Sequence, residues 1–335
     1  MRFGLALPHY GFSFPDGEVS FERMAAVAHR AESVGFDSVW VSDHFFYTFE
    51  RYGLPADPIA SLEPLTALAG LAVTTEHVRL GTLVLGAPFR HPSILAKTAA
   101  TIDALSGGRL ELGLGAGWLE REFEAFGYAF GSTGERFDLL EDVLRILTAF
   151  EGDEPATVEA GRFRLRGART IPPPVQRPRA PIWLGSKGGP RSLAMAARFA
   201  EGWNTVWRWS PEAYAATSAA ADAACERAGR DPGTLRRSVG LYALIGDDDA
   251  ELRAVFERGR AAMPGNAMAD ESLDSWCADT LSGTPERVIE RAEAFAAIGV
   301  EELIVSPWVL PFALIEPDQI ERFAERVIRP MRDGR

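Results

Sequence analysis

Short apolar runs rich in β-branched residues alternate along the chain with longer stretches whose apolar positions recur at helical spacing. This alternation is typical of strand–helix units repeated around a parallel sheet. Eight strands are predicted, over Phe3–Leu7, Ser38–Val41, Val78–Val84, Leu110–Leu114, Ile182–Leu184, Gly202–Thr205, Ser238–Ile245 and Glu302–Val305. Helical windows lie between them, over 21–34, 64–75, 92–105, 135–150, 190–200, 211–228, 250–259 with 285–297, and 317–331. Eight strands and eight helical units predict an α/β protein with a (β/α)8 TIM barrel.

Two segments interrupt this rhythm. Residues 152–181 combine two short alternating runs with a proline-rich stretch, which predicts an inserted hairpin followed by a linker. Residues 263–284 mix Ala, Asp, Ser and Gly, which predicts a mobile late loop. With this extra length assigned, residues 1–335 are expected to form one barrel domain.

Composition narrows the classes of protein. Hydrophobic residues make up 47% and charged residues 24%, the balance of a globular protein with a large core. A net charge of -12 disfavours nucleic acid as a partner. No apolar run approaches the roughly 20 residues that span a bilayer, and the first residues resemble no signal peptide, so we expect a cytoplasmic protein without a membrane partner. The two cysteines, Cys225 and Cys277, provide neither a disulfide framework nor a zinc site, and no metal is expected.

In a parallel barrel the active site lies at the carboxyl ends of the strands, so the residues that follow each predicted strand are the candidates. One such segment, Gly113–Gly117, has too few correctly spaced glycines for a dinucleotide fingerprint, because Trp118 occupies the third position. The glycines therefore serve either close packing at the strand end or the approach of a flat ligand.

A second glycine-rich segment, Gly185–Gly189, follows a strand and precedes a helix that begins at Pro190. Backbone amides at a helix start, together with a serine hydroxyl and a cation, form an anion site. Lys187 lies here and is one of only two lysines in the chain, the other being Lys97. A phosphate site is predicted, and a turn required only for its geometry is the alternative.

Three histidines, His9, His44 and His91, follow predicted strands. Asp43 and His44 place a hydrogen-bond acceptor beside a group that exchanges protons near neutral pH, which makes His44 the catalytic candidate. A structural role for His44 is the alternative. Many aromatic residues also fall at strand ends and predict a roomy apolar pocket. The residues expected to line its substrate side are His9, Tyr10, Phe46, Trp118, Trp203, Trp207 and Trp308.

Several of these segments together resemble the luciferase-like monooxygenase superfamily, and within it most closely the oxidoreductases that depend on coenzyme F420, an 8-hydroxy-5-deazaflavin. The matching segments are Ser42–Phe45, Arg79–Val84, Phe89–Pro92, Leu95–Lys97, Thr101–Asp103, Leu105–Arg109, Leu112–Trp118, Pro181–Gly185, Ala197–Asn204 and Ser282–Glu286. They span most of the chain.

The resemblance implies hydride transfer between F420 and a small, apolar organic substrate, with His44 beside the ring. It also implies a non-prolyl cis peptide at Leu83–Val84 that backs the deazaflavin. The cofactor-binding residues would be Asp43, Thr82, Leu83, Val84, Gly115, Ala116, Arg121, Gly185, Ser186, Lys187, Gly188 and Gly189. Sugar-phosphate dehydrogenases of the superfamily carry glutamate at the position of Trp118 and asparagine at that of Arg121, so a sugar phosphate is disfavoured.

Two other functions stay open on the same fold. One is a two-component monooxygenase that uses reduced FMN and a separate cofactor reductase. The other is a flavin-binding protein without catalysis. The resemblance further implies a homodimer.

Overall fold

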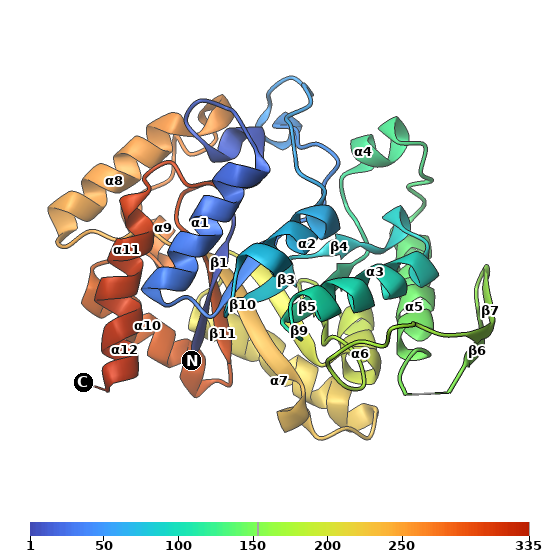
Figure 1. Cartoon of the computed structure of the whole chain (residues 1–335). Coiled ribbons are helices and arrows are strands. Elements are labelled where there is room, and N and C mark those ends of the chain that lie inside the picture. Colours follow the sequence, from blue (N-terminus) through green and yellow to red (C-terminus); the bar gives the residue numbers. More distant parts are fainter. Residues whose placement is uncertain (153, 335) are drawn as a thin grey trace.

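The computed structural model describes residues 1–152 and 154–334, so that Asp153, inside the predicted insertion, and Arg335 lie outside the described residues. A closed barrel of parallel strands forms its centre (Figure 1). The strands are β1 (Arg2–Ala6), β2 (Ser38–Val41), β3 (Arg79–Thr82) with β4 (Leu85–Gly86), β5 (Leu110–Gly115), β8 (Ile182–Gly185), β9 (Gly202–Trp207), β10 (Arg236–Tyr242) and β11 (Glu302–Ser306). Pairing of β3 with β5 closes the ring, so the predicted (β/α)8 barrel is confirmed.

The third strand differs from its prediction as one continuous run. A cis peptide at Leu83–Val84 divides it into β3 and β4, and this bond is the one that the resemblance implied. A second non-prolyl cis peptide, Val206–Trp207, lies at the end of β9 and was not predicted.

Helices surround the barrel close to their predicted positions. They are α1 (Phe21–Val34), α2 (Pro64–Thr74), α3 (Pro92–Leu105), α4 (Glu120–Ala125), α5 (Thr133–Thr148), α6 (Pro190–Phe199), α7 (Pro211–Arg227), α8 (Asp249–Ala262), α9 (Leu273–Ala278), α10 (Pro285–Ala297), α11 (Asp318–Phe323) and α12 (Arg329–Asp333). A π-helical turn over Ala324–Ile328 joins the last two. Helix α4 was missed from the sequence, because its six residues are too few to show a helical period.

The two irregular segments are partly structured. The insertion contains an antiparallel hairpin of β6 (Ala156–Ala160) and β7 (Phe163–Ala168), as predicted, which projects from the barrel (Figure 1). The late segment was expected to be a loop throughout, but it holds α9. Trp276 of α9 is buried and donates a hydrogen bond from Nε1 to Ser282 Oγ at 3.0 Å, which explains why this part is ordered into a helix.

Two tryptophans fill the half of the barrel that lies away from the carboxyl ends of its strands. Trp40 and Trp183 meet edge to face with their ring centroids 6.2 Å apart. A Cβ atom at Gly81 would lie 2.1 Å from the Trp40 ring and one at Gly202 would lie 2.2 Å from the Trp183 ring, so only glycine leaves room for them. Because this half is packed solid, the open space lies at the carboxyl ends of the strands.

Candidate active site

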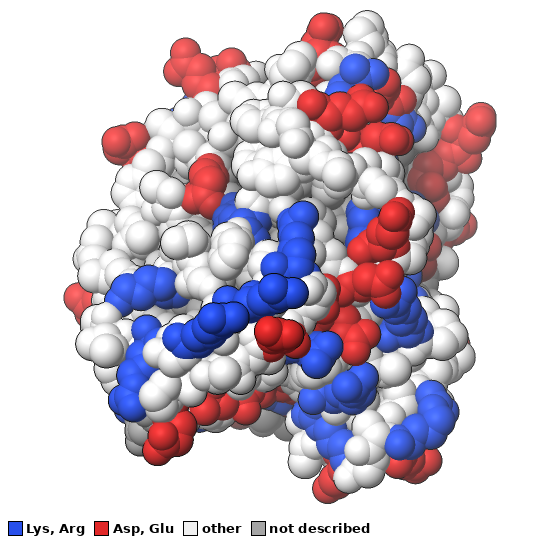
Figure 2. Space-filling model, turned by 90° about the vertical axis from the view of Figure 1, so that its right-hand side faces the viewer, with Lys and Arg blue, Asp and Glu red and all other residues white. Residues whose placement is uncertain are grey.

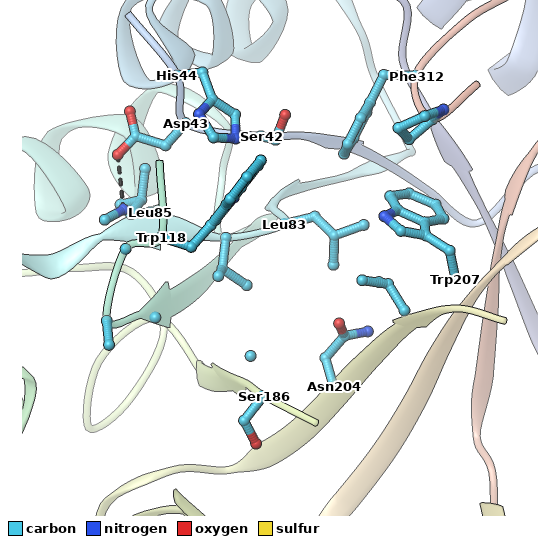
Figure 3. Close-up of a pocket in the computed structure, with 18 of the residues that line it drawn as sticks. Ser42, Asp43, His44, Leu83, Leu85, Trp118, Ser186, Asn204, Trp207 and Phe312 are labelled. Atoms are coloured by element: carbon cyan, nitrogen blue, oxygen red, sulfur yellow. Dashed lines mark hydrogen bonds between the residues drawn. The ribbon is translucent and has the colours of Figure 1, made fainter. Parts of the chain in front are cut away.

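A cavity of about 500 Å³ opens at the carboxyl ends of the strands, and most of its walls are aromatic or aliphatic (Figure 3). Of the residues predicted from the sequence, it is lined by Tyr10, Asp43, His44, Leu83, Val84, Gly115, Ala116, Trp118, Gly185, Ser186, Lys187 and Trp207. The predicted residues outside its lining are His9, Phe46, Thr82, Arg121, Gly188, Gly189, Trp203 and Trp308.

The residues outside the lining have contacts elsewhere. Arg121 is exposed and pairs with Glu50 across the rim, with Nη2 to Oε1 at 2.7 Å. Trp308 is buried in a separate apolar cluster beneath α8 and α9. Thr82 is buried and bonds both backbone groups of Gly113, which fastens β3 to β5. Thr82 points away from the cavity because successive side chains of a strand face opposite ways.

Val84 and three glycines form the floor of the cavity. A Cβ atom at Gly113, Gly115 or Gly185 would come within 2.8 Å of a Val84 methyl group. The missing side chains on β5 and β8 therefore let the segment after the cis bond lie flat against these strands. Close packing is thus one reason for the glycines, and the floor that results is smooth enough for a flat ligand.

His44 is held by a carboxylate that sequence reasoning missed. Its Nδ1 donates to Glu122 Oε1 at 2.9 Å, and Glu122 Oε2 accepts the Phe45 amide at 3.1 Å. Glu122 is buried on α4, 78 residues further along the chain. With Nδ1 as the donor, Nε2 carries a lone pair, and no other described residue bonds to it. The pair therefore has the geometry of a general base and its orienting carboxylate.

Asp43 does not pair with His44, contrary to the sequence interpretation. Its carboxylate accepts the Gly86 amide at 2.8 Å and both Arg90 terminal nitrogens, at 2.5 and 2.9 Å (Figure 3 shows the Gly86 bond). Arg90 also pairs with Glu63. These ion pairs raise the pKa of Arg90 against the effect of burial. Asp43 thus anchors β4 directly after the cis bond.

Tyr10, Ser42 and His9 form a buried hydrogen-bonded chain beside His44. The Tyr10 hydroxyl bonds to Ser42 Oγ, which lies 3.1 Å from His9 Nε2. His9 Nδ1 lies 2.7 Å from the Leu7 carbonyl oxygen and must be the donor there. Burial lowers the pKa of His9 to about 4 and raises that of Tyr10 well above its usual value, so both are neutral near pH 7.

The glycine-rich loop after β8 forms the side of the cavity opposite His44. Ser186 and Lys187 line it, and α6 begins just beyond, at Pro190. Ser186 Oγ accepts a hydrogen bond from Trp203 Nε1 at 3.1 Å, so the buried Trp203 supports the loop from behind. The Lys187 amine bonds to the Val206 carbonyl oxygen, and desolvation lowers its pKa.

More than half of the lining residues had not been assigned to the site from the sequence. The additional lining residues are Ser42, Tyr47, Arg51, Leu85, Gly86, Phe89, Gly117, Glu122, Phe137, Asn204, Thr205, Val206, Pro311 and Phe312. Several of them follow or end strands, and that position was the available signal. Phe312 was not detectable, because its left-handed backbone, with φ of 58°, is set by Ser13 and Ser306 from other parts of the chain.

Within residues 1–152 and 154–334, no cluster of three or more His, Cys, Asp or Glu side chains is arranged to hold a metal ion. None of the described helices is both long and apolar enough to cross a membrane.

Comparison with known proteins identifies the family to which the chain belongs. The family model described as luciferase-like monooxygenase matches residues 1–302. An F420-dependent hydroxymycolic acid dehydrogenase of Mycobacterium tuberculosis is 32% identical over 259 residues, which cover 76% of this chain and 69% of the relative. The pyrimidine monooxygenase RutA of Escherichia coli is also 32% identical over 259 residues, covering 72% of this chain and 62% of RutA.

Among solved structures, an F420-dependent secondary alcohol dehydrogenase in complex with an F420–acetone adduct superposes with a TM-score of 0.77. It is 21% identical, and the superposition covers 98% of each chain, so it shows the shared fold. The barrel with its split third strand and the family match over residues 1–302 lead to one conclusion: this chain is an enzyme of the luciferase-like monooxygenase family.

Proposed function

We propose that the enzyme transfers a hydride between coenzyme F420 and a small, mainly apolar substrate that carries a hydroxyl or carbonyl group. The observation that carries this proposal is the His44–Glu122 pair, whose free Nε2 faces an aromatic cavity. The two F420-dependent dehydrogenases among the similar proteins, one named for a hydroxylated acid and one for secondary alcohols, support both the cofactor and the substrate group.

The residues present suit a flat cofactor with an anionic tail. Val84 and Gly115 offer a smooth surface to a ring, and the aromatic ring of Trp118 lines the same cavity. Ser186 and Lys187 offer a hydroxyl and a cation beside the start of α6, where a phosphate is stabilised. Such local attraction is needed because the net charge of the chain is -12.

When bound, the deazaflavin supplies the carbon that accepts or returns the hydride. As the C–H hydride of an alcohol leaves, His44 Nε2 takes the hydroxyl proton, and the alcohol becomes a carbonyl compound. Glu122 stabilises the imidazolium that forms, at the 2.9 Å contact with Nδ1. In the reverse direction the imidazolium returns the proton to the oxygen as the hydride arrives on carbon.

A monooxygenase that uses reduced FMN is the second candidate, and the equal identity to RutA favours it. The same floor and anion loop would hold FMN, and a separate reductase would supply the reduced flavin. Titration of the purified protein with reduced F420 and reduced FMN, followed by absorbance, separates the candidates. We expect F420 to bind with micromolar affinity, roughly -8 kcal/mol. Binding of FMN alone, with oxygen-dependent turnover, would contradict the proposal.

Two substitutions test the catalytic pair. His44→Ala should lower kcat by about 10²- to 10⁴-fold, the usual contribution of a general base. Glu122→Gln should also lower kcat. The amide of glutamine can donate to His44 Nδ1, which moves the ring proton to Nε2 and removes the lone pair of the base. The affinity for F420 should change little in both variants. His77→Ala and Glu120→Gln, at exposed positions, serve as matched controls. Unchanged turnover in His44→Ala would favour the non-catalytic flavin-binding protein.

A further inference from the structure

We propose that Tyr10 binds the reacting oxygen of the substrate, and that Ser42 and His9 are positioning residues which let Tyr10 switch between two hydrogen-bonded states. This inference rests on the proposed hydride transfer and adds a second contact to the substrate oxygen besides His44. It starts from the location of the Tyr10 and Ser42 side chains, which both line the cavity next to His44.

The contacts of His9 fix the direction of the hydrogen-bonded chain. His9 Nδ1 must donate to the Leu7 carbonyl oxygen, so His9 Nε2 can only accept. Ser42 Oγ, 3.1 Å away, then donates to Nε2 and accepts from the Tyr10 hydroxyl. In this state the Tyr10 proton is engaged by Ser42 Oγ and is not available to a ligand.

A second state is available without leaving a buried group unpaired. The Ser42 backbone amide lies 3.3 Å from His9 Nε2 and can satisfy it alone. The Ser42 hydroxyl is then free to turn and donate to the Tyr10 oxygen, and the Tyr10 proton is released to a ligand. Because each buried polar atom keeps a partner, the reversal avoids the desolvation penalty that usually opposes such changes.

The switched state suits an oxygen that gains charge during hydride transfer. Tyr10 would donate to the alcohol or carbonyl oxygen while His44 exchanges the proton with the same atom. The ring centroids of Tyr10 and His44 lie 6.3 Å apart, and both residues line the cavity, so the two side chains are neighbours in its wall. In Figure 3 the Ser42 hydroxyl lies between His44 and Phe312, on the wall that the substrate oxygen would face.

The surroundings keep this group a hydrogen-bond donor rather than an acid. Tyr10 is 1% exposed and packs between Phe12, at a stacked centroid distance of 4.9 Å, and Tyr47, at 5.5 Å. His9 is 1% exposed and is covered by Phe312 at 4.9 Å. No carboxylate or cation bonds to either side chain among the described residues, so the chain orients the substrate oxygen without taking its proton.

The test measures kcat/KM for F420 reduction with propan-2-ol, cyclohexanol and 1-phenylethanol, and F420 affinity by fluorescence. Tyr10→Phe should lower kcat/KM by about 10- to 100-fold through the loss of one donor to the developing charge, with F420 affinity within about twofold. Ser42→Ala should lower kcat/KM less than Tyr10→Phe does. In the Tyr10→Phe background, Ser42→Ala should have no further effect on kcat/KM, because the donor that Ser42 supports is already absent.

Tyr214→Phe is the matched control, since the buried Tyr214 hydroxyl has no partner among the described residues and lies outside the cavity lining. Two results would overturn the inference without contradicting the hydride transfer. One is a decrease in kcat/KM for Tyr10→Phe that is no larger than for the control. The other is additive effects of the Tyr10 and Ser42 substitutions on kcat/KM. The inference would also be overturned if wild-type protein binds F420 but turns over none of the three alcohols. Absence of F420 binding in wild type would instead overturn the proposed function.

Discussion

Single side chains in the cavity depend on partners that are distant in the sequence. Glu122 fixes the tautomer of His44, Arg90 pairs with Asp43, and His9 bonds to Ser42. Each partner comes from another element of the barrel. The chemistry of a residue here is therefore a property of its contacts and not of its neighbours in the chain.

His9 should make stability depend on pH. Its pKa is about 4 in the folded protein, because burial disfavours the charged form, and about 6.5 in the unfolded chain. As the pH falls, the unfolded state therefore binds the proton first. The contribution of His9 to the free energy of unfolding is complete above pH 6.5 and is lost as the pH falls toward 4. By pH 5 the loss is about 2 kcal/mol.

Urea unfolding at pH 7 and pH 5 measures this effect. His9→Gln, which keeps a donor and an acceptor but does not titrate, should show a smaller decrease in the free energy of unfolding than wild type between the two pH values. Equal decreases in the two proteins would show that His9 is not buried in its neutral form.

At the scale of elements, the active site depends on how the ends of four strands, β2, β3, β5 and β8, meet. The cis bond ends β3, Asp43 at the end of β2 holds the Gly86 amide of β4, and glycines of β5 and β8 leave room for Val84. The side chains of the cavity floor are thus set by strand geometry.

Gly115→Ala should damage this floor without unfolding the barrel. The new Cβ atom would lie 2.8 Å from a Val84 methyl group, and overpacking of this kind costs about 1–3 kcal/mol. Because Val84 must then rise into the cavity, F420 affinity should fall about tenfold or more, roughly 1.4 kcal/mol. Fluorescence titration and thermal unfolding measure the two effects.

Gly134→Ala is the control for this substitution. Gly134 lies in α5, and an added Cβ atom would meet no atom closer than 3.7 Å. Alanine should therefore stabilise the helix by up to about 1 kcal/mol and leave F420 affinity unchanged. An F420 affinity in Gly115→Ala equal to that of Gly134→Ala would contradict the role of the Val84 floor.

At the scale of the whole molecule, charge and apolar surface are unevenly distributed. Figure 2 shows positive and negative side chains interspersed over the face that carries the β6–β7 hairpin. The outer surface of α2 and α3 differs. Helix α2 has no charged residue, and Val73 and Ile94 are 64% and 63% exposed. An exposed apolar surface with few charges, here only Lys97 beside Ile94, is typical of a surface that packs against another protein.

We propose that this α2–α3 face joins two copies of the chain in a homodimer. Light scattering after size-exclusion chromatography should give twice the chain mass of 36.5 kDa at micromolar concentration. Ile94→Asp should shift the equilibrium toward the monomer, because a charge in an apolar interface is desolvated without a partner. Ala219→Asp, on the exposed side of α7, should not. A dimer that persists in Ile94→Asp would exclude this face.

The barrel was predictable because the repeat of apolar strands and amphipathic helices is a local pattern in the sequence. Seven of the eight predicted strands overlap observed strands as single runs, and the exception, Val78–Val84, is interrupted by the cis bond that the family resemblance implied. Helix α4 was not predictable, since six residues carry no clear period. It happens to bring Glu122 to the site.

The sequence by itself determined the barrel, the strand ends at which chemistry gathers, and the candidates His44 and Lys187, because periodicity and strand order are local properties. Only the tertiary structure decided which groups meet there. Closure of the barrel brings Glu122 to His44 across 78 residues, turns Asp43 toward Arg90, and links Tyr10 to Ser42 and His9. These contacts depend on register and side-chain direction between elements, which no local pattern encodes.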